Sequence, residues 1–364
     1  MLKALLSHDL PRSRPLAALL VLTVLALAAA PFLFPGARSL DVAAKILVFA
    51  VLVGSYDLLL GYTGIVSFAH AMFFGIGAYG VAIACSRAGD PGWPAVFGGL
   101  GAALALSALL ALLIGLLSLR VRALFFAMIT MAVAAAFATL VSQLSTLTGG
   151  EDGLSFSVPL AIRPSTDYLD DPVLGADIDG RFVAYYLLFA AAVVLVLLLL
   201  RIVNSPFGRV LQAIRENDFR AEAIGYRTVV YRTVSNVIAA LFATVAGAMM
   251  ALWLRYNSPD TSMSMEIMLN LLLIVVIGGM GTIWGALLGS ALFMLAQNYL
   301  QDLMKLAGAA FGDVPVLGAV LAPDRWLLWM GLLFVLAVYR FPAGIVGQLR
   351  AGAARRARRT GASP

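Results

Sequence analysis

A histidine and a serine lie inside a strongly hydrophobic stretch of the chain, where polar side chains are costly to bury. They are His70 and Ser67, within the segment from Gly61 to Gly80 (GYTGIVSFAHAMFFGIGAYG). An ionisable side chain in such surroundings usually faces the interior of a helix bundle or a polar pathway. His8 is the only other histidine, which argues against a metal site. The sequence therefore predicts for His70 either a buried hydrogen bond to a neighbouring helix or a place along a solute pathway.

Glycines surround these polar residues, and a second glycine-rich segment (IGGMGTIWGALLG) follows later in the chain. Small residues let helices approach closely or let a helix break within a membrane. Close packing is the plainer interpretation for most of the glycines, and a helix break or a translocation pathway is the alternative. The candidates from both segments are Gly61, Gly64, Ser67, His70, Gly75, Gly77, Gly278, Gly279 and Gly281. Further polar side chains interrupt other apolar stretches: Lys45, Asp57, Asn270, Gln297 and Asn298.

One long segment of the chain is charged and amphipathic, from Asn204 to Arg232 (NSPFGRVLQAIRENDFRAEAIGYRTVVYR). Ser205 is a good N-cap and proline suits the first helical position, so we expect a helix to start at Pro206. A second short turn follows, and Gly225 offers a helix stop. The segment is either an amphipathic helix lying on a bilayer surface or a docking element for another protein. One apolar stripe with helical spacing marks the first helix: Phe207, Val210, Leu211 and Ile214.

The sequence contains no visible constellation of catalytic residues. It has no GxxxxGK[ST] phosphate loop, no HExxH or GxSxG motif and no paired carboxylates. The single cysteine, Cys85, excludes an internal disulfide and a CxxC site. We therefore expect no enzyme, no cofactor and no metal site, and active transport would need energy from a separate subunit or from a modest ion site.

Composition predicts the kind of element that must position these residues. The chain is 62% hydrophobic and 12% charged, with a mean hydropathy of +0.96, whereas about a quarter of the residues in a soluble domain are charged. The formal net charge of +6 could suggest nucleic acid, but the basic residues gather in short connections and at the C-terminal end, as membrane topology signals do. The sequence therefore predicts an all-α polytopic protein in a lipid bilayer, with no nucleic-acid partner.

A bilayer requires about 20 apolar residues per helix, and ten runs approach that length. Five precede an acidic connection and five follow it, so the halves could form an inverted repeat. Asp57 lies near the end of its run, where it can reach the membrane interface. The runs cover residues 16–34, 42–60, 65–85, 93–119, 123–144, 182–203, 233–254, 267–280, 283–300 and 326–339.

Orientation follows from Lys and Arg in the short connections. Basic residues mark the N-terminal segment, the turn that holds Arg120 and Arg122, the charged segment and the C-terminal tail. The connection 145–181 is instead strongly acidic and belongs outside. We therefore expect a cytoplasmic segment (1–15), a transmembrane domain (16–340) with an outer loop (145–181) and a cytoplasmic loop (204–232), and a basic cytoplasmic tail (341–364).

Three segments resemble, in order, the characteristic segments of LivM-type permeases of branched-chain amino acid ABC importers. They are GYTGIVSFAHAMFFGIGAYG, SPFGRVLQAIRENDFRAEAIGY and LLLIVVIGGMGTIWGALLGSALF, and the resemblance covers roughly residues 42–342. It implies a bacterial inner-membrane subunit that works with a LivH-type permease, two cytoplasmic ATPase subunits that bind the ATP, and a periplasmic substrate-binding protein. It also implies a coupling segment that docks on an ATPase, carried here by Arg215, Glu216, Asn217, Ala221, Glu222 and Gly225.

The function that this resemblance implies is translocation of branched-chain amino acids, or related small polar solutes, by alternating access. The long acidic loop and the FAHAM sequence depart from the family pattern, and close relatives handle urea or short amides, so those solutes are an alternative. An ion-coupled secondary transporter and a membrane scaffold are alternatives from other classes. Copurification with an ATPase would favour the importer, whereas uptake driven by an ion gradient alone would favour the secondary transporter.

Overall fold

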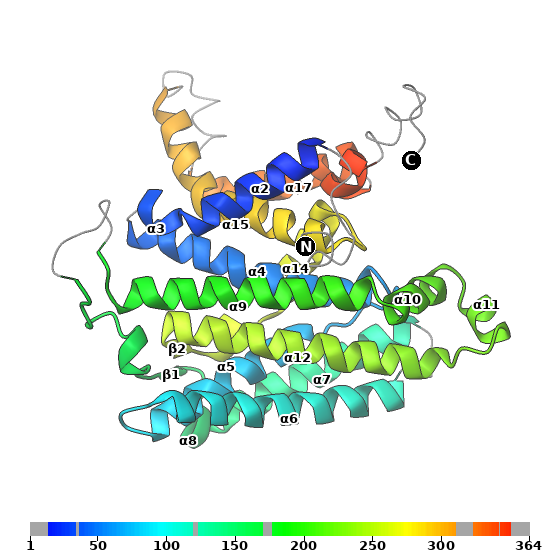
Figure 1. Ribbon diagram of the computed structural model, residues 1–364, viewed down its shortest axis with the longest axis horizontal. Coiled ribbons are helices and arrows are strands. Elements are labelled where there is room, and N and C mark those ends of the chain that lie inside the picture. Colours follow the sequence, from blue (N-terminus) through cyan, green and yellow to red (C-terminus); the bar gives the residue numbers. More distant parts are fainter. Residues whose placement is uncertain are drawn as a thin grey trace.

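The structure, a computed structural model, describes residues 14–33, 36–118, 123–169, 177–310, 323–341 and 343–350. Long helices dominate these ranges, and α6, α9 and α12 run along the long axis of the molecule (Figure 1). Within the described residues the only sheet is one antiparallel pair of two-residue strands, in which Leu154 lies opposite Asn257. The predicted all-α class is confirmed.

The elements follow one another in this order: α2 (Arg14–Ala28), α3 (Ala30–Leu33), α4 (Ala37–Leu60), α5 (His70–Arg87), α6 (Trp93–Ser118), α7 (Ala123–Gln143), α8 (Ser145–Thr148), β1 (Leu154–Ser155), η1 (Leu160–Ile162), α9 (Gly180–Val203), α10 (Pro206–Glu216), α11 (Asp218–Ala223), α12 (Thr228–Leu254), β2 (Tyr256–Asn257), α13 (Pro259–Ser262), α14 (Met265–Gly278), α15 (Ile283–Ala310), η2 (Pro323–Arg325) and α17 (Trp326–Arg340).

Each of the ten predicted apolar runs overlaps at least one of these helices. Eight segments in the described part of the chain are helical, long and apolar enough to cross a membrane. The helices of the other two predicted runs, α2 and α5, do not meet that criterion. α2 has 15 residues, and α5 carries a polar residue at each end, His70 and Arg87. Its predicted start at residue 65 was early, because residues 61–69 are not helical.

The first predicted run is broken between α2 and α3, and proline explains the break. Pro31 has no N–H to offer the Leu27 carbonyl four residues earlier. The hydroxyl of Tyr185 on α9 donates to that carbonyl at 2.5 Å, and Tyr186 donates to the carbonyl of Ala28 at 2.8 Å. Two tyrosines therefore replace helix hydrogen bonds and attach the end of α2 to α9.

The centre of the molecule is α4. From Val42 to Leu59 every residue except Lys45 is buried, because α9, α12 and α15 pack around this helix. A helix enclosed on all sides needs apolar residues all round, and its sequence has them. By contrast, α6, α7 and α17 expose many large apolar side chains. This surface suits a lipid bilayer.

Glycines allow α5 and α12 to pack closely. A Cβ atom at Gly77 would overlap the carbonyl of Thr244, and one at Gly247 would overlap the carbonyl of Phe74. A Cβ atom at Gly75 would collide with the flexible side chain of Met263. The geometry at Gly77 is therefore that of helix packing, whereas Gly75 makes room for a side chain from the connection between α13 and α14.

The bundle has two distinct ends. α10 and α11 lie at one end, here called the α10 end, whereas α8, β1 and β2 lie at the other, the α8 end (Figure 1). The described parts of the acidic connection 145–181 are at the α8 end, opposite the charged segment. Arg120, Arg122, residues 1–13 and residues 351–364 lie outside the described residues, and the inverted repeat and the domain boundaries stay predictions.

Several helices extend beyond their predicted bounds, among them α12 and α15. α12 begins at Thr228, inside the predicted 204–232 loop, where the threonine hydroxyl donates to a Glu222 carboxylate oxygen at 2.7 Å. α15 continues past residue 300 to Ala310, and Asp302 in that extension pairs with Arg38 at 2.6 Å. Hydropathy ends a run where charges begin, but a helix can continue through charged residues that find partners.

Candidate functional site

The charged segment folds as the two short helices α10 and α11. The Ser205 hydroxyl accepts a hydrogen bond from the Gly208 N–H at 3.4 Å, and Pro206 occupies the first turn, as predicted. The predicted apolar stripe faces the protein, since Leu211 and Ile214 are buried. Phe207 is half-buried and stacks on Tyr231 of α12 with ring centroids 5.7 Å apart. The stripe therefore binds α10 to the bundle.

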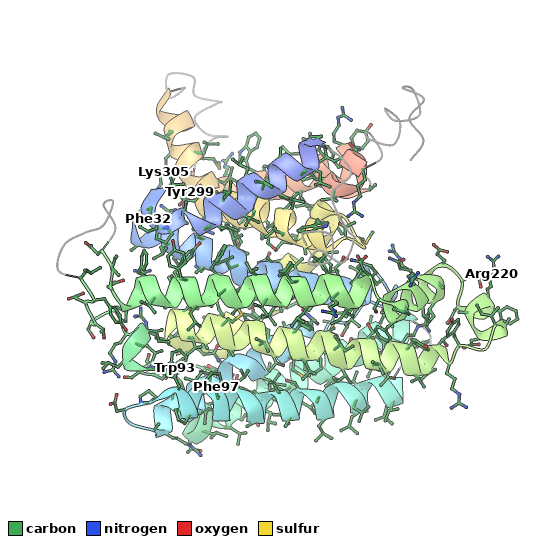
Figure 2. All side chains as sticks on the ribbon, in the orientation of Figure 1. Phe32, Trp93, Phe97, Arg220, Tyr299 and Lys305 are labelled. Carbon is green, nitrogen blue, oxygen red and sulfur yellow. The ribbon has the colours of Figure 1, made fainter. Side chains whose placement is uncertain are left out.

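α11 projects at the α10 end, and Arg220 lies near its tip (Figure 2). Asn217 caps the helix by accepting from the Arg220 N–H at 2.9 Å, and Asp218 pairs with Arg232 of α12 at 3.0 Å. Ala221 is buried and Glu222 binds Thr228, so α11 is tied back to α12. Gly225 follows with a φ of +97°, a conformation that suits glycine at a helix end.

Two large apolar side chains at this tip face outward. Phe219 is 82% exposed and Ile224 is 67% exposed, while the charged Glu216 is exposed at the end of α10. Exposed aromatic residues beside charges are typical of protein interaction surfaces. Phe219 was not among the predicted site residues, although a phenylalanine in the middle of a charged helix was the available signal.

Arg215 joins α10 to the end of α4. Its guanidinium donates a hydrogen bond to the Gly61 carbonyl, and its side chain passes beside Gly64, whose φ is +72°. A Cβ atom at Gly64 would lie 3.2 Å from an Arg215 side-chain carbon. Two of the three predicted motifs therefore meet here, through residues 61 to 64 and Arg215.

The third motif reaches the same place through Asp57. Its two carboxylate oxygens accept from the Gly281 N–H at 2.9 and 3.1 Å, and the positive charge of Arg215 acts on this carboxylate. Asp57 is 1% exposed, so its carboxylate is enclosed by protein at the end of α4. We call this set the α4–α10 junction: Asp57, Gly61, Arg215 and Gly281.

Glycine is required at two positions of the junction. A Cβ atom at Gly61 would collide with the Asp57 carboxylate and the Gly281 nitrogen. Gly281 has a φ of +80°, which L side chains rarely adopt. Gly279 has a φ of +114° in the same turn, and a Cβ atom at Gly278 would collide with Gly285. These glycines let the turn between α14 and α15 approach the end of α4.

His70 lies apart from the junction, at the first position of α5. Its Nε2 is 2.9 Å from the Ser55 hydroxyl oxygen, and that hydroxyl donates to the Leu52 carbonyl at 2.8 Å. Because the single serine proton is used there, Nε2 must be the donor. His70 is buried, and Nδ1 has no hydrogen-bond partner in the described residues. The bond to α4 matches the first of the two predicted roles.

Residues just before α5 hold this non-helical segment in place. The Ser67 hydroxyl accepts from the Ala69 N–H at 3.4 Å, and the Thr130 hydroxyl of α7 accepts from the Phe68 N–H at 3.0 Å.

Within the part of the chain that the structure describes, no group of three His, Cys, Asp or Glu side chains could hold a metal ion.

A polar pocket of about 290 Å³ lies between α4, α13, α14 and α15. It gathers four of the polar residues that interrupt the apolar runs and adds two acidic side chains. They come from four different helices, so no single local pattern predicted the pocket. The six are Lys45, Asp260, Glu266, Asn270, Gln297 and Asn298.

Comparison with known proteins gives one family. The model for the "Branched-chain amino acid transport system / permease component" matches residues 39–338. The chain is 26% identical over 326 residues to the high-affinity branched-chain amino acid transport system permease protein LivM of Salmonella typhimurium and to that of Escherichia coli, covering 86% of this chain and 74% of each relative. A probable LivM permease protein of Methanocaldococcus jannaschii is 28% identical over 148 residues, 40% of this chain and 41% of that protein. No solved structure matched.

Proposed function

The chain belongs to the permease-component family of branched-chain amino acid transport systems, and from this premise we propose that it is the LivM-type membrane subunit of an ABC importer for branched-chain amino acids. The relatives that it matches over most of their length are permeases with that printed function. The observation that carries the coupling mechanism is the α4–α10 junction. There a charged surface helix is bonded directly to the central membrane helix.

The proposed location is a bacterial inner membrane with the α10 end in the cytoplasm. Five arginines of the charged segment support this orientation, as does the acidic connection at the opposite end. The charged segment contributes Arg209, Arg215, Arg220, Arg227 and Arg232. In this orientation the α8 end faces the periplasm, and we propose cytoplasmic termini from the basic residues near both ends of the sequence.

The proposed partners are a LivH-type permease, two cytoplasmic ATPase subunits and a periplasmic substrate-binding protein. The absence of a phosphate loop in the sequence supports ATP binding by the partner subunits. The exposed Phe219 and Ile224 offer an apolar contact for an ATPase, and the charges around them can fix its orientation.

In the proposed mechanism, the ATPase pair moves α10 and α11 when it closes. α10 is bound to the bundle by its apolar stripe and to the end of α4 by Arg215. Asp57 passes the movement to the turn between α14 and α15 through Gly281. ATP inside and the binding protein outside would each favour one arrangement of these helices, and this differential affinity couples hydrolysis to transport.

A test of this function begins with purification of the chain after coexpression with the three kinds of partner. We expect the ATPase to copurify and ATP-dependent uptake of labelled leucine to be inhibited by unlabelled isoleucine and valine. Inhibition by urea and acetamide instead would replace the amino-acid substrate with a short amide. Absence of any copurifying ATPase would contradict the importer assignment.

A further inference from the structure

The polar pocket at the α8 end has the shape and chemistry of a small ligand site. α13 follows β2 directly, so the pocket lies toward the end of the bundle that the acidic connection covers. Lys45 is eight residues after the start of α4, roughly 12 Å along the helix axis. Ligand pockets in proteins begin at roughly 300 Å³, so a cavity of about 290 Å³ suits one small solute.

The inner wall of the pocket is apolar. Phe49, Phe74, Met250 and Met294 line it and are all buried. Methionine side chains adapt to differently branched aliphatic groups. The wall is therefore suited to an aliphatic side chain of variable branching.

Charges of both signs line the same pocket. Lys45 pairs with Asp41 at 2.8 Å, with both side chains 28% exposed. Asp41 is itself held by the Trp253 indole N–H at 2.8 Å, and an ammonium group has three protons to donate. One proton serves Asp41, so the others remain for an anion.

The acidic side of the pocket is formed by Asp260 and Glu266. Both are exposed at its rim, and neither forms an ion pair with any described residue. The amides of Asn270 and Gln297 complete the polar lining. A cation and carboxylates thus share one small pocket with an apolar wall.

We propose that this pocket binds one aliphatic α-amino acid as a zwitterion during its passage through the membrane subunit. Lys45 and the Asn270 amide receive the α-carboxylate, Glu266 and Asp260 receive the α-ammonium group, and the apolar wall receives the side chain. The inference rests on the proposed function and deepens it. A neutral amide such as urea would leave both charged sides of the pocket without counterions.

Ligand protection of an introduced cysteine tests the pocket directly. Cys85 is the only cysteine of this chain and is buried, so Cys85→Ala removes every thiol from the chain. Gln297→Cys then places a thiol in the pocket lining, and Glu151→Cys, on the exposed outer connection, is the control. The assembled importer in nanodiscs is treated with a cationic methanethiosulfonate reagent, with and without leucine.

We expect leucine to slow modification of Gln297→Cys about tenfold and to leave Glu151→Cys unchanged. 4-Methylpentanoate and isopentylamine, which each lack one charged group of leucine, and urea should give no protection. A thiol that is never modified would mean that a neighbouring subunit covers the pocket, and modification without leucine protection would mean that no amino acid binds there. Either result overturns the proposal.

Charge variants give a second readout. Glu266→Gln and Lys45→Gln should each raise the leucine concentration for half-protection roughly tenfold, while Lys45→Arg keeps the charge and should protect nearly as well as the parent. Glu151→Gln and Lys305→Gln are matched controls outside the pocket. If complexes without a charge substitution take up leucine with ATP but show no protection, the pocket proposal is wrong and the proposed function stands. If these complexes show no ATP-dependent uptake, the proposed function is wrong.

Discussion

Arg215 and Asp57 show how a charge can be used at the end of a membrane helix. A buried carboxylate is costly unless it is paired and hydrogen-bonded. Asp57 accepts hydrogen bonds from the Gly281 N–H with both carboxylate oxygens, and these bonds offset part of that cost. Arg215 donates a hydrogen bond to the Gly61 carbonyl at the end of α4. This bond joins α10 to α4.

Replacing Arg215 should uncouple α10 from α4. A hydrogen bond from a charged group contributes about 1.5–3 kcal/mol, so Arg215→Ala should lower ATP-driven leucine uptake by roughly tenfold or more. Arg209→Ala is the matched control, because Arg209 is exposed on the same helix and has no ion pair with a described residue. Uptake equal in the two variants, measured at equal amounts of assembled complex, would refute the role of Arg215.

Ser55 should matter for stability through His70. Ser55→Ala leaves the buried Nε2 of His70 without its partner, at a cost of about 1–3 kcal/mol. We expect a lower melting temperature for the purified complex, measured against Ser157→Ala at an exposed serine of the outer connection. Equal melting temperatures for the two variants would show that the hydrogen bond contributes nothing.

At the residue scale the sequence predicted types of residue better than their partners. Gly61, Gly281 and Arg215 were all selected, each from its own motif. The partners of Asp57 were not predicted, because hydropathy shows how near a residue lies to the end of a run and not which turn covers it. The backbone N–H of Gly281 comes from 224 residues further along the chain, and no local pattern reports it.

The helices α10 and α11 of the charged segment have different surroundings. α10 buries its stripe against the bundle, so this stripe is not available to the bilayer surface. α11 lies beyond the other helices at this end of the bundle (Figure 1), and Phe219 on it and Ile224 directly after it are exposed. α10 therefore attaches the charged segment to the bundle, and α11 is accessible to a partner protein.

Loss of the exposed aromatic side chain on α11 should weaken ATPase binding. We expect Phe219→Ala to reduce the copurifying ATPase by about tenfold, since a buried aromatic anchor is often worth 2 kcal/mol or more. Tyr339→Ala, which removes an 87% exposed aromatic residue from α17, is the control. ATPase recovery that falls equally in both variants would show no special role for Phe219.

Reversing the charge of Glu222 tests the attachment of α11. Glu222→Lys loses the hydrogen bond from Thr228 and places a cation beside Arg220 and Arg227. We expect ATP hydrolysis to lose most of its stimulation by substrate-loaded binding protein, while the chain still inserts in the membrane. Full stimulation in this variant would contradict the coupling role of α11.

Element boundaries were predictable where local signals were strong. Ser205, Pro206 and Gly225 marked the start of α10 and the end of the helical pair closely. The start of α5 was missed because residues 65–69 are mostly apolar without being helical. The start of α12 was missed because its first turn is polar, with Thr228 bonded to the side chain of Glu222. Hydropathy measures partition into a membrane, not backbone conformation.

At the scale of the whole molecule, composition was sufficient to predict an all-α membrane protein, and ten apolar runs correspond to helices. The polar pocket was not predictable, since Lys45, Asn270 and Gln297 come from three different helices and look like isolated exceptions in sequence. Only the packed structure shows that these residues line the same cavity.

The energy source for transport tests the central claim most directly. Leucine uptake should be measured in vesicles that contain the chain with all its partners and ATP inside, and in vesicles that contain the chain alone under a proton or sodium gradient. The importer account predicts accumulation in the first and none in the second. Accumulation by the chain alone, driven by the ion gradient without an ATPase, would contradict it.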